Sequence, residues 1–239
     1  MALLHEKRII IVAADLPSPK DVIALAQKLQ YAQGIWGLKV HTRHLESMGG
    51  TALVAAIKEF GHKVFVDRKA HDIPSAVADM IRSYCEIGAD MVTVHASGGW
   101  DMVSEARRAA EARLAILAVT VLTSIDADTC RRIYKDEPRK AVATLTNEAV
   151  PYADGIVCSA EEVGSDEVRK FAPDLLYRVV PGIRPAGADT HEQKRVGTPG
   201  QAIRDGATHL VIGRPIYEKG DPKENVARIW DEIREAEQA

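Results

Sequence analysis

Three charged side chains at the end of one apolar run give the strongest chemical signal in this sequence. Asp67 and Lys69 follow the run 64–66, and Asp72 comes three residues later. Because side chains alternate along a strand, Asp67 and Lys69 should project from the same face. Carboxylates on both sides favour the cationic form of Lys69, which suits stabilisation of negative charge and proton donation rather than Schiff-base chemistry. A surface cluster of ion pairs is the alternative.

Two further charged residues end apolar runs elsewhere in the first fifth of the chain. Lys39 lies in the run 37–40, and Asp15 follows the run 9–14. Both could face the same site as Lys69. Lys39 could instead be a surface lysine with its charged end in solvent, and Asp15 could simply begin a turn.

The last quarter of the chain contains a candidate phosphate site. The segment 181–184, Pro-Gly-Ile-Arg, and the segment 213–215, Gly-Arg-Pro, each follow an apolar run. In barrel enzymes the loops after the last two strands commonly bind phosphate through backbone N–H groups and an arginine. The long stretch 184–200, with several glycines, is typical of a lid that closes over a ligand. A surface loop without function is the alternative.

The elements that must position these residues form a regular alternation. Eight short, β-branched runs, apolar as strands buried on both faces should be, alternate with segments of helical periodicity. Eight such units in 239 residues predict an α/β fold, a single (βα)8 TIM barrel spanning one domain, 1–239, rather than an open doubly wound sheet. The predicted strands are 9–12, 37–40, 63–66, 91–94, 115–119, 155–158, 176–180 and 209–212.

The ends of several predicted helices are also marked. Ser18 followed by Pro19 predicts the start of the first helix, because serine caps a helix and proline fits its first position. Glycines follow several helical segments, where a left-handed residue commonly ends a helix. They are Gly34, Gly61, Gly88 and Gly206.

Composition excludes several classes of protein. The chain is 46% hydrophobic and 27% charged, which excludes disordered and fibrous proteins. With 31 basic against 34 acidic residues, it lacks the positive charge typical of nucleic-acid binding. Its longest apolar stretch, 9–14, is far below the ~18 residues that span a bilayer. We therefore expect neither a nucleic-acid partner nor membrane insertion.

The cysteines and histidines predict neither disulfides nor a metal site. The three cysteines are scattered, as is typical of thiols in a reducing compartment, and the charged N-terminal segment does not resemble a signal peptide. We therefore expect a cytoplasmic protein. Histidines lie in separate segments without ligand spacing, so we expect no metal.

Taken together, these motifs resemble the orotidine 5'-phosphate decarboxylase family over essentially the whole chain. The most specific match is Asp67-x-Lys69-x-x-Asp72-Ile73-Pro74. The resemblance implies a barrel enzyme that decarboxylates orotidine 5'-monophosphate to UMP in de novo pyrimidine biosynthesis, with neither metal nor organic cofactor. The other matching segments are 12–15, 37–40, 94–99, 121–124, 181–184, 193–196 and 212–217.

The resemblance implies a role for each charged residue. Lys69 would protonate C6 of the pyrimidine after CO2 leaves, and Asp67 would lie near the departing carboxylate. Asp72 would reach across a homodimer interface into the neighbouring site. Lys39 and Asp15 would hold the ribose hydroxyls and extend the charge network.

The remaining implied substrate-binding residues come from later loops. Ser124 would contact the pyrimidine, and Pro181 belongs to the loop after the seventh strand. Gln193, Gly213 and Arg214 would hold the phosphate.

Two positions depart from the family pattern. Ala76 stands where many members carry threonine, which removes a hydroxyl contact expected across the dimer, although Ser75 lies next to it. Arg68 stands where an apolar residue is common. Strand alternation predicts that Arg68 points away from the site, so it should affect packing more than chemistry.

Two other functions fit parts of the pattern. Related barrel lyases that act on sugar phosphates, such as hexulose-phosphate synthase, use magnesium and share Asp-x-Lys-x-x-Asp. They lack the Ile-Pro that follows it here. A non-catalytic binder of UMP-like ligands would have no need of Lys69.

Overall fold

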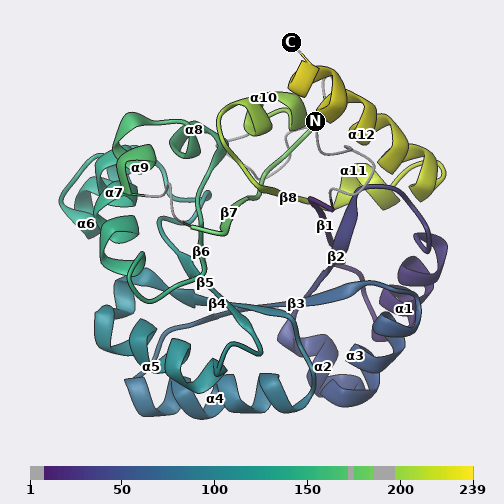
Figure 1. Ribbon diagram of the computed structural model, residues 1–239, viewed down its shortest axis with the longest axis horizontal. Coiled ribbons are helices and arrows are strands. Elements are labelled where there is room, and N and C mark those ends of the chain that lie inside the picture. The colour runs from purple at the N-terminus through teal and green to yellow at the C-terminus, as the bar shows by residue number, and fades with distance from the viewer. Residues whose placement is uncertain (1–7, 172–174, 186–196, 239) are drawn as a thin grey trace.

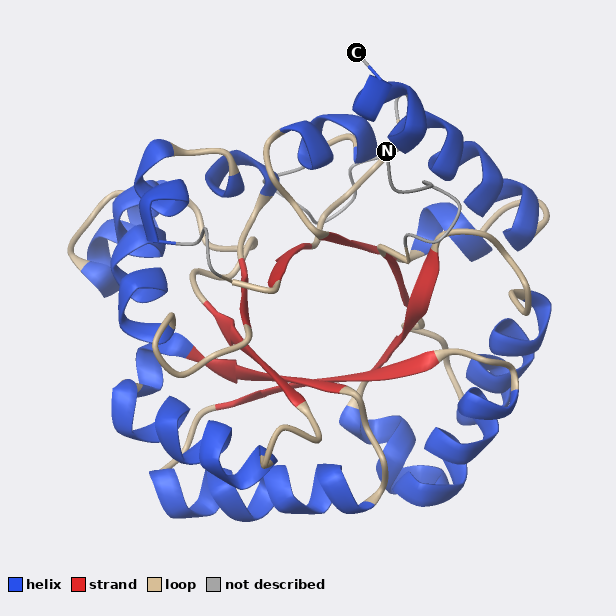
Figure 2. Ribbon diagram, viewed as in Figure 1, coloured by secondary structure: helices blue, strands red, loops and turns tan. Residues whose placement is uncertain are grey.

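The computed structural model describes residues 8–171, 175–185 and 197–238. Within these ranges, parallel strands close into a barrel in chain order, β1 to β8. The helices surround this ring of strands on the outside (Figures 1 and 2). The predicted (βα)8 barrel is therefore confirmed.

The strands agree closely with the runs predicted from the sequence. Each predicted run overlaps one strand, because apolar β-branched residues suit a layer buried on both faces. The strands are β1 (Ile10–Ala13), β2 (Ile35–Val40), β3 (Lys63–Ala70), β4 (Met91–His95), β5 (Ala115–Val119), β6 (Gly155–Val157), β7 (Tyr177–Val180) and β8 (His209–Ile212).

The largest difference is at β3, which runs four residues past its predicted end at residue 66. Its pairing with β4 is irregular there. Val66 pairs with Val92, and the next paired residue is Ala70, opposite Val94. The charged residues 67–69 therefore belong to an interrupted strand rather than to the following loop.

The helices of the outer layer bury one face against the barrel. They are α1 (Pro19–Lys28), α2 (Thr42–Met48), α3 (Gly50–Glu59), α4 (Pro74–Glu86), α5 (Trp100–Ala110), α6 (Ala127–Tyr134), α7 (Pro138–Ala149), α8 (Ala160–Val163), α9 (Asp166–Phe171), α10 (Pro199–Arg204), α11 (Arg214–Tyr217) and α12 (Pro222–Gln238), with a short 3-10 turn at Ala96–Gly98.

The predicted helix ends are confirmed except at Gly34, which lies in the turn before β2 rather than at the end of α1, whose last residue is Lys28. Ser18 caps α1, its hydroxyl accepting the N–H of Asp21 while the Asp21 carboxylate accepts the N–H of Ser18. All four glycines predicted to follow helices have positive φ. At Gly34, with φ +79°, an added Cβ would also collide with the ring of Trp230, so both conformation and space require glycine there.

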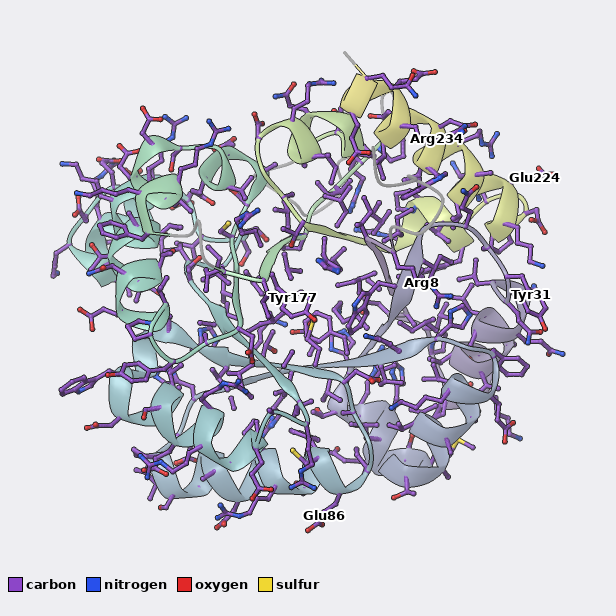
Figure 3. All side chains as sticks on the ribbon, in the orientation of Figure 1. Arg8, Tyr31, Glu86, Tyr177, Glu224 and Arg234 are labelled. Carbon is purple, nitrogen blue, oxygen red and sulfur yellow. The ribbon has the colours of Figure 1, made fainter. Side chains whose placement is uncertain are left out.

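The apolar core has two parts, as expected when a barrel is wrapped by helices. A large layer lies between strands and helices. A smaller cluster fills the barrel interior and includes Ile11, Phe65, Met91 and Leu117. Side chains occupy the interior of the strand ring, and Tyr177 lies at its edge (Figure 3). This packing gives the residues at the strand ends a rigid base.

Aromatic rings close the barrel at the amino-terminal ends of the strands. His209 packs edge-on against Trp36, with ring centroids 6.0 Å apart, and lies 5.1 Å from the Tyr177 ring. Burial and the nearby Lys63 ammonium lower the pKa of His209 to about 4. The imidazole is therefore neutral at pH 7, as suits a residue packed among apolar rings.

Among the described residues, no helix has both the length and the apolar composition needed to cross a membrane. The same part of the chain contains no group of three or more His, Cys, Asp or Glu side chains arranged to hold a metal ion.

Candidate active site

A cavity of about 520 Å³ opens at the carboxyl-terminal ends of the strands. This is the end where barrel enzymes carry their active sites, and the volume lies in the usual range for small-molecule ligands, about 300–1,000 Å³. One side of the cavity carries Asp15, Lys39, Asp67 and Lys69. Residues that follow β7 and β8, next to β1 in the barrel, also line it. The candidate residues from distant parts of the chain therefore share one cavity.

The four charged residues alternate in sign along a continuous row. Lys39 Nζ lies 3.2 Å from Asp15 Oδ1 and 3.0 Å from Asp67 Oδ2. Lys69 Nζ lies 2.6 Å from the same Asp67 oxygen. Strand geometry produces the row, because β1, β2 and β3 are neighbours in the barrel. Asp15 follows β1, Lys39 lies in β2, and β3 carries both Asp67 and Lys69. The alternative of a surface ion-pair cluster is excluded for Asp67, and that of a surface lysine is excluded for Lys39, because their side chains are only 10% and 9% exposed.

The charges around the buried pair Asp67 and Lys39 determine the charge state of each. Burial alone would raise the pKa of Asp67, but the ammonium groups of Lys39 and Lys69 outweigh it and lower that pKa to about 2. Burial opposes the charge on Lys39 as well, and the carboxylates of Asp67 and Asp15 outweigh it, raising the pKa of Lys39. Asp67 is thus a carboxylate and Lys39 an ammonium throughout the neutral range.

Asp15 contacts His41 as well as Lys39. His41 Nε2 lies 2.8 Å from Asp15 Oδ1, the oxygen that Lys39 also contacts. Burial would raise the pKa of Asp15, but the hydrogen bond from His41 and the charge of Lys39 lower it well below its usual range. Asp15 is therefore ionised and held by two partners.

The part of the cavity that follows β7 and β8, next to β1 in the barrel, is positively charged. Arg184 and Arg214 both line it, together with Pro181 and Gly213. Burial and the nearby charge of Arg214 lower the pKa of Arg184. At Gly213 an added Cβ would lie 3.2 Å from the Ala13 carbonyl oxygen, so this position has little room for a side chain. Two guanidinium groups beside an exposed backbone suit a bound anion such as a phosphate.

Two of the predicted site residues that the structure describes, Ser124 and Asp72, do not line this cavity. Ser124 is exposed in the turn after β5, although its neighbours Leu122 and Thr123 do line the cavity. Asp72 is also exposed, with Oδ1 accepting the backbone N–H of Ile73 at 2.7 Å. Gln193, with most of the predicted lid, lies outside the described residues.

Both residues that depart from the family pattern, Arg68 and Ala76, lie within the described part of the chain. Arg68 is exposed and its Nε lies 3.3 Å from Met80 Sδ on α4, so it does point away from the cavity and packs on a helix. Phe65, Asp67 and Lys69 line the cavity together, as strand alternation predicts. Ala76 is half-buried within α4.

Comparison with known proteins adds a second, independent line of evidence. The family model described as "Orotidine 5'-phosphate decarboxylase / HUMPS family" matches residues 8–229. The chain belongs to this family. The resemblance inferred from the sequence motifs is therefore confirmed.

Individual relatives agree with the family assignment. A protein named orotidine 5'-phosphate decarboxylase from Halorhodospira halophila (strain DSM 244 / SL1) is 43% identical over 232 residues, covering 95% of this chain and 96% of the relative. One of the same name from Moorella thermoacetica (strain ATCC 39073 / JCM 9320) is 38% identical over 248 residues, covering 98% and 95%. The crystal structure of orotidine 5'-phosphate decarboxylase from Lactobacillus acidophilus matches with a TM-score of 0.80 and 31% identity, covering 95% and 99%. The predicted enzyme class, a carboxy-lyase of this family, is confirmed.

Four polar cavity residues were not predicted as site residues, namely His41, Thr93, Thr123 and Tyr217. His41 lies two residues after Lys39, so strand alternation could have identified it. Thr93 is the only polar side chain in the run 91–94, which is a weak signal. Thr123 and Tyr217 lie in the segments 121–124 and 212–217 that resemble the family, but neither was assigned a role. The contact of Tyr217 with the Asp15 backbone exists only once the barrel closes.

Proposed function

We propose that this enzyme converts orotidine 5'-monophosphate to UMP and CO2, with Lys69 as the proton donor. One observation carries the proposal. Lys69 presents its ammonium group at the cavity, 2.6 Å from a buried carboxylate. Relatives that are 38–43% identical over nearly the full chain are named orotidine 5'-phosphate decarboxylase.

The reaction needs a fixed positive charge next to C6 of the pyrimidine. The bond between C6 and the carboxylate breaks, CO2 leaves, and the electron pair stays on C6. Lys69 then transfers a proton to C6, which gives UMP, and the neutral amine regains its proton from solvent. An ammonium group already held in place stabilises the carbanion without reorganisation at the moment of reaction.

Asp67 holds that ammonium group and lies on the side where the substrate carboxylate would leave. Because Asp67 is ionised and mostly buried, it stays negatively charged when substrate binds. Lys39 lies between Asp67 and Asp15, and the Asp15 carboxylate would accept a hydrogen bond from a ribose hydroxyl. We assign Lys39 and Asp15 to the ribose and to the charge network on this basis.

The phosphate would occupy the positive side of the cavity. Arg214 would donate to its oxygens beside the exposed backbone of Gly213, and Pro181 would border the same space. Binding energy gained at this remote phosphate can contribute to the rate at C6 when it organises the site. We keep Gln193 as a predicted phosphate ligand and Ser124 as a predicted pyrimidine contact.

We further propose a homodimer in which Asp72 completes the neighbouring site. Asp72 is exposed rather than directed into its own cavity. The next residue, Ile73, is also exposed, at 65%, and so is Trp100 at the start of α5, at 60%. Large exposed apolar side chains next to a functional carboxylate are consistent with an interface that a second copy covers.

Organisation as a single domain and a cytoplasmic location also remain predictions.

A direct assay tests the reaction. Purified protein in EDTA should consume orotidine 5'-monophosphate, followed by the change in its ultraviolet absorbance, and should release one CO2 for each UMP formed. Because the family description also names HUMPS proteins, a sugar phosphate with and without magnesium is the matched control. EDTA-sensitive turnover of the sugar phosphate, with none of the nucleotide, would contradict the proposal. Ligand binding without turnover would favour a non-catalytic binder.

A further inference from the structure

We infer that Thr93 is a positioning residue for this reaction, because its single hydroxyl holds both the backbone of Lys69 and the carboxylate of Asp67 in place. The inference rests on the proposed role of Lys69. Thr93 is in the middle of β4, is only 1% exposed and borders the cavity. It is connected to both members of the Lys69–Asp67 ion pair, whereas its neighbours in β4 are mostly apolar.

The backbone gives the first reason. Lys69 has φ +51°, a left-handed conformation that is unfavourable for a residue with a side chain. It lies where β3 and β4 lose their regular pairing, so that residues 67–69 of β3 stand opposite Thr93 alone. The N–H of Lys69 donates to Thr93 Oγ1 at 2.8 Å. The threonine hydroxyl therefore satisfies a backbone donor in the irregular part of the ladder.

The carboxylate gives the second reason. Thr93 Oγ1 also lies 3.1 Å from Asp67 Oδ1. The backbone N–H of Lys69 can only donate a hydrogen bond, so the Thr93 hydroxyl oxygen accepts it through a lone pair. The hydroxyl then donates its own proton to the Asp67 carboxylate. Both lysines contact the other carboxylate oxygen, Oδ2. Thr93 thus fixes the rotation of the Asp67 carboxylate and keeps Oδ2 directed at the ammonium groups.

Through these two hydrogen bonds, the Thr93 hydroxyl links the proton donor, Lys69, to the carboxylate that holds it, Asp67. If it were removed, the strained backbone at Lys69 would lose a hydrogen-bond partner and could relax. Asp67 could also rotate. Either change would move the Lys69 ammonium group relative to C6 without altering the phosphate contacts. A displacement of about 1 Å can reduce the rate of an enzymatic step roughly 100-fold.

The test compares Thr93→Val, which keeps the shape and removes the hydroxyl, with Thr93→Ser, which keeps the hydroxyl. The matched control is Thr120→Val. Thr120 is also fully buried, and its hydroxyl donates to the Val157 carbonyl oxygen at 2.8 Å, away from the ion pair. Each protein is assayed for kcat and KM with orotidine 5'-monophosphate, and its folding is checked by circular dichroism and Tm.

We expect Thr93→Val to lower kcat about 100-fold with KM nearly unchanged, and Thr93→Ser to retain most of the wild-type kcat. Thr120→Val should lower Tm but leave kcat near wild type. If Thr93→Val does not fold, Thr93→Ala replaces it in the same comparison with serine. Wild-type kcat in the valine or alanine variant, or an equal loss in the serine variant, would overturn the inference.

Lys69→Ala, measured in parallel, separates this inference from the proposed function. A collapse of activity in Lys69→Ala with full activity in Thr93→Val would refute only the role of Thr93. Absence of decarboxylation by the wild-type enzyme would refute the proposed function itself.

Discussion

Mixing two inactive variants offers a quantitative test of the shared active site. Lys69 lines its own cavity, whereas Asp72 is exposed and lies away from it. In a two-fold symmetric dimer, a site would combine Lys69 of one subunit with Asp72 of the other. Homodimers of Lys69→Ala and of Asp72→Asn should therefore each have two defective sites. A heterodimer of the two variants has one site with both substitutions and one site with neither.

The expected recovery follows from this arrangement. Random exchange of equal amounts makes half of the dimers mixed, and half of the sites in each mixed dimer are intact. The mixture should therefore regain about one quarter of the wild-type kcat per subunit, with an unchanged KM. Activity is measured from nucleotide absorbance after exchange has been verified by mass spectrometry of differently tagged subunits.

A second mixture provides the control. Asp67 and Lys69 belong to the same cavity, with Nζ and Oδ2 2.6 Å apart. Mixing Asp67→Asn with Lys69→Ala should therefore give heterodimers without an intact site and no recovery. Equal recovery in both mixtures, or none in the Asp72 mixture despite complete exchange, would refute the shared site.

Four further predictions follow from the site and the core. Lys69→Ala should lower kcat/KM by many orders of magnitude, and near-wild-type turnover would show that another group donates the proton. Arg214→Ala should raise KM roughly 10- to 100-fold, as expected for the loss of charge-assisted hydrogen bonds to phosphate; it should have little further effect on the phosphate-free nucleoside. Decarboxylation should be unaffected by EDTA, and loss of activity that magnesium restores would show a metal requirement. The pKa of His209 falls from 6.5 to about 4 on folding, so the unfolded chain binds the proton more readily than the folded one. The contribution of His209 to the free energy of unfolding should therefore be fully present above pH 6.5. It should fall by up to about 3 kcal/mol as the pH drops to 4. In urea unfolding, His209→Phe should lose that part of the pH dependence, and an unchanged dependence would assign it to other groups.

The sequence alone was sufficient for the architecture. Strands buried on both faces must be apolar almost throughout, so each run that forms β1 to β8 was visible without any knowledge of tertiary contacts. Local backbone requirements were equally visible, as at Ser18 and Gly34. The pairing of Asp67 with Lys69 on one face followed from strand alternation, which is a property of the chain itself.

The charge states and the fine geometry of the site depended on tertiary structure. Lys39 and Asp15 were individually ambiguous, because each has an ordinary role on a surface or in a turn. Only the pairing of β2 with β1 and β3 places Lys39 between two carboxylates and buries it. The extension of β3 to Ala70 and the left-handed backbone of Lys69 were also unpredictable, since they depend on pairing with β4 and on Thr93. A sequence pattern specifies which face a side chain takes, but its electrostatic environment comes from residues that are distant in the chain and adjacent only after folding.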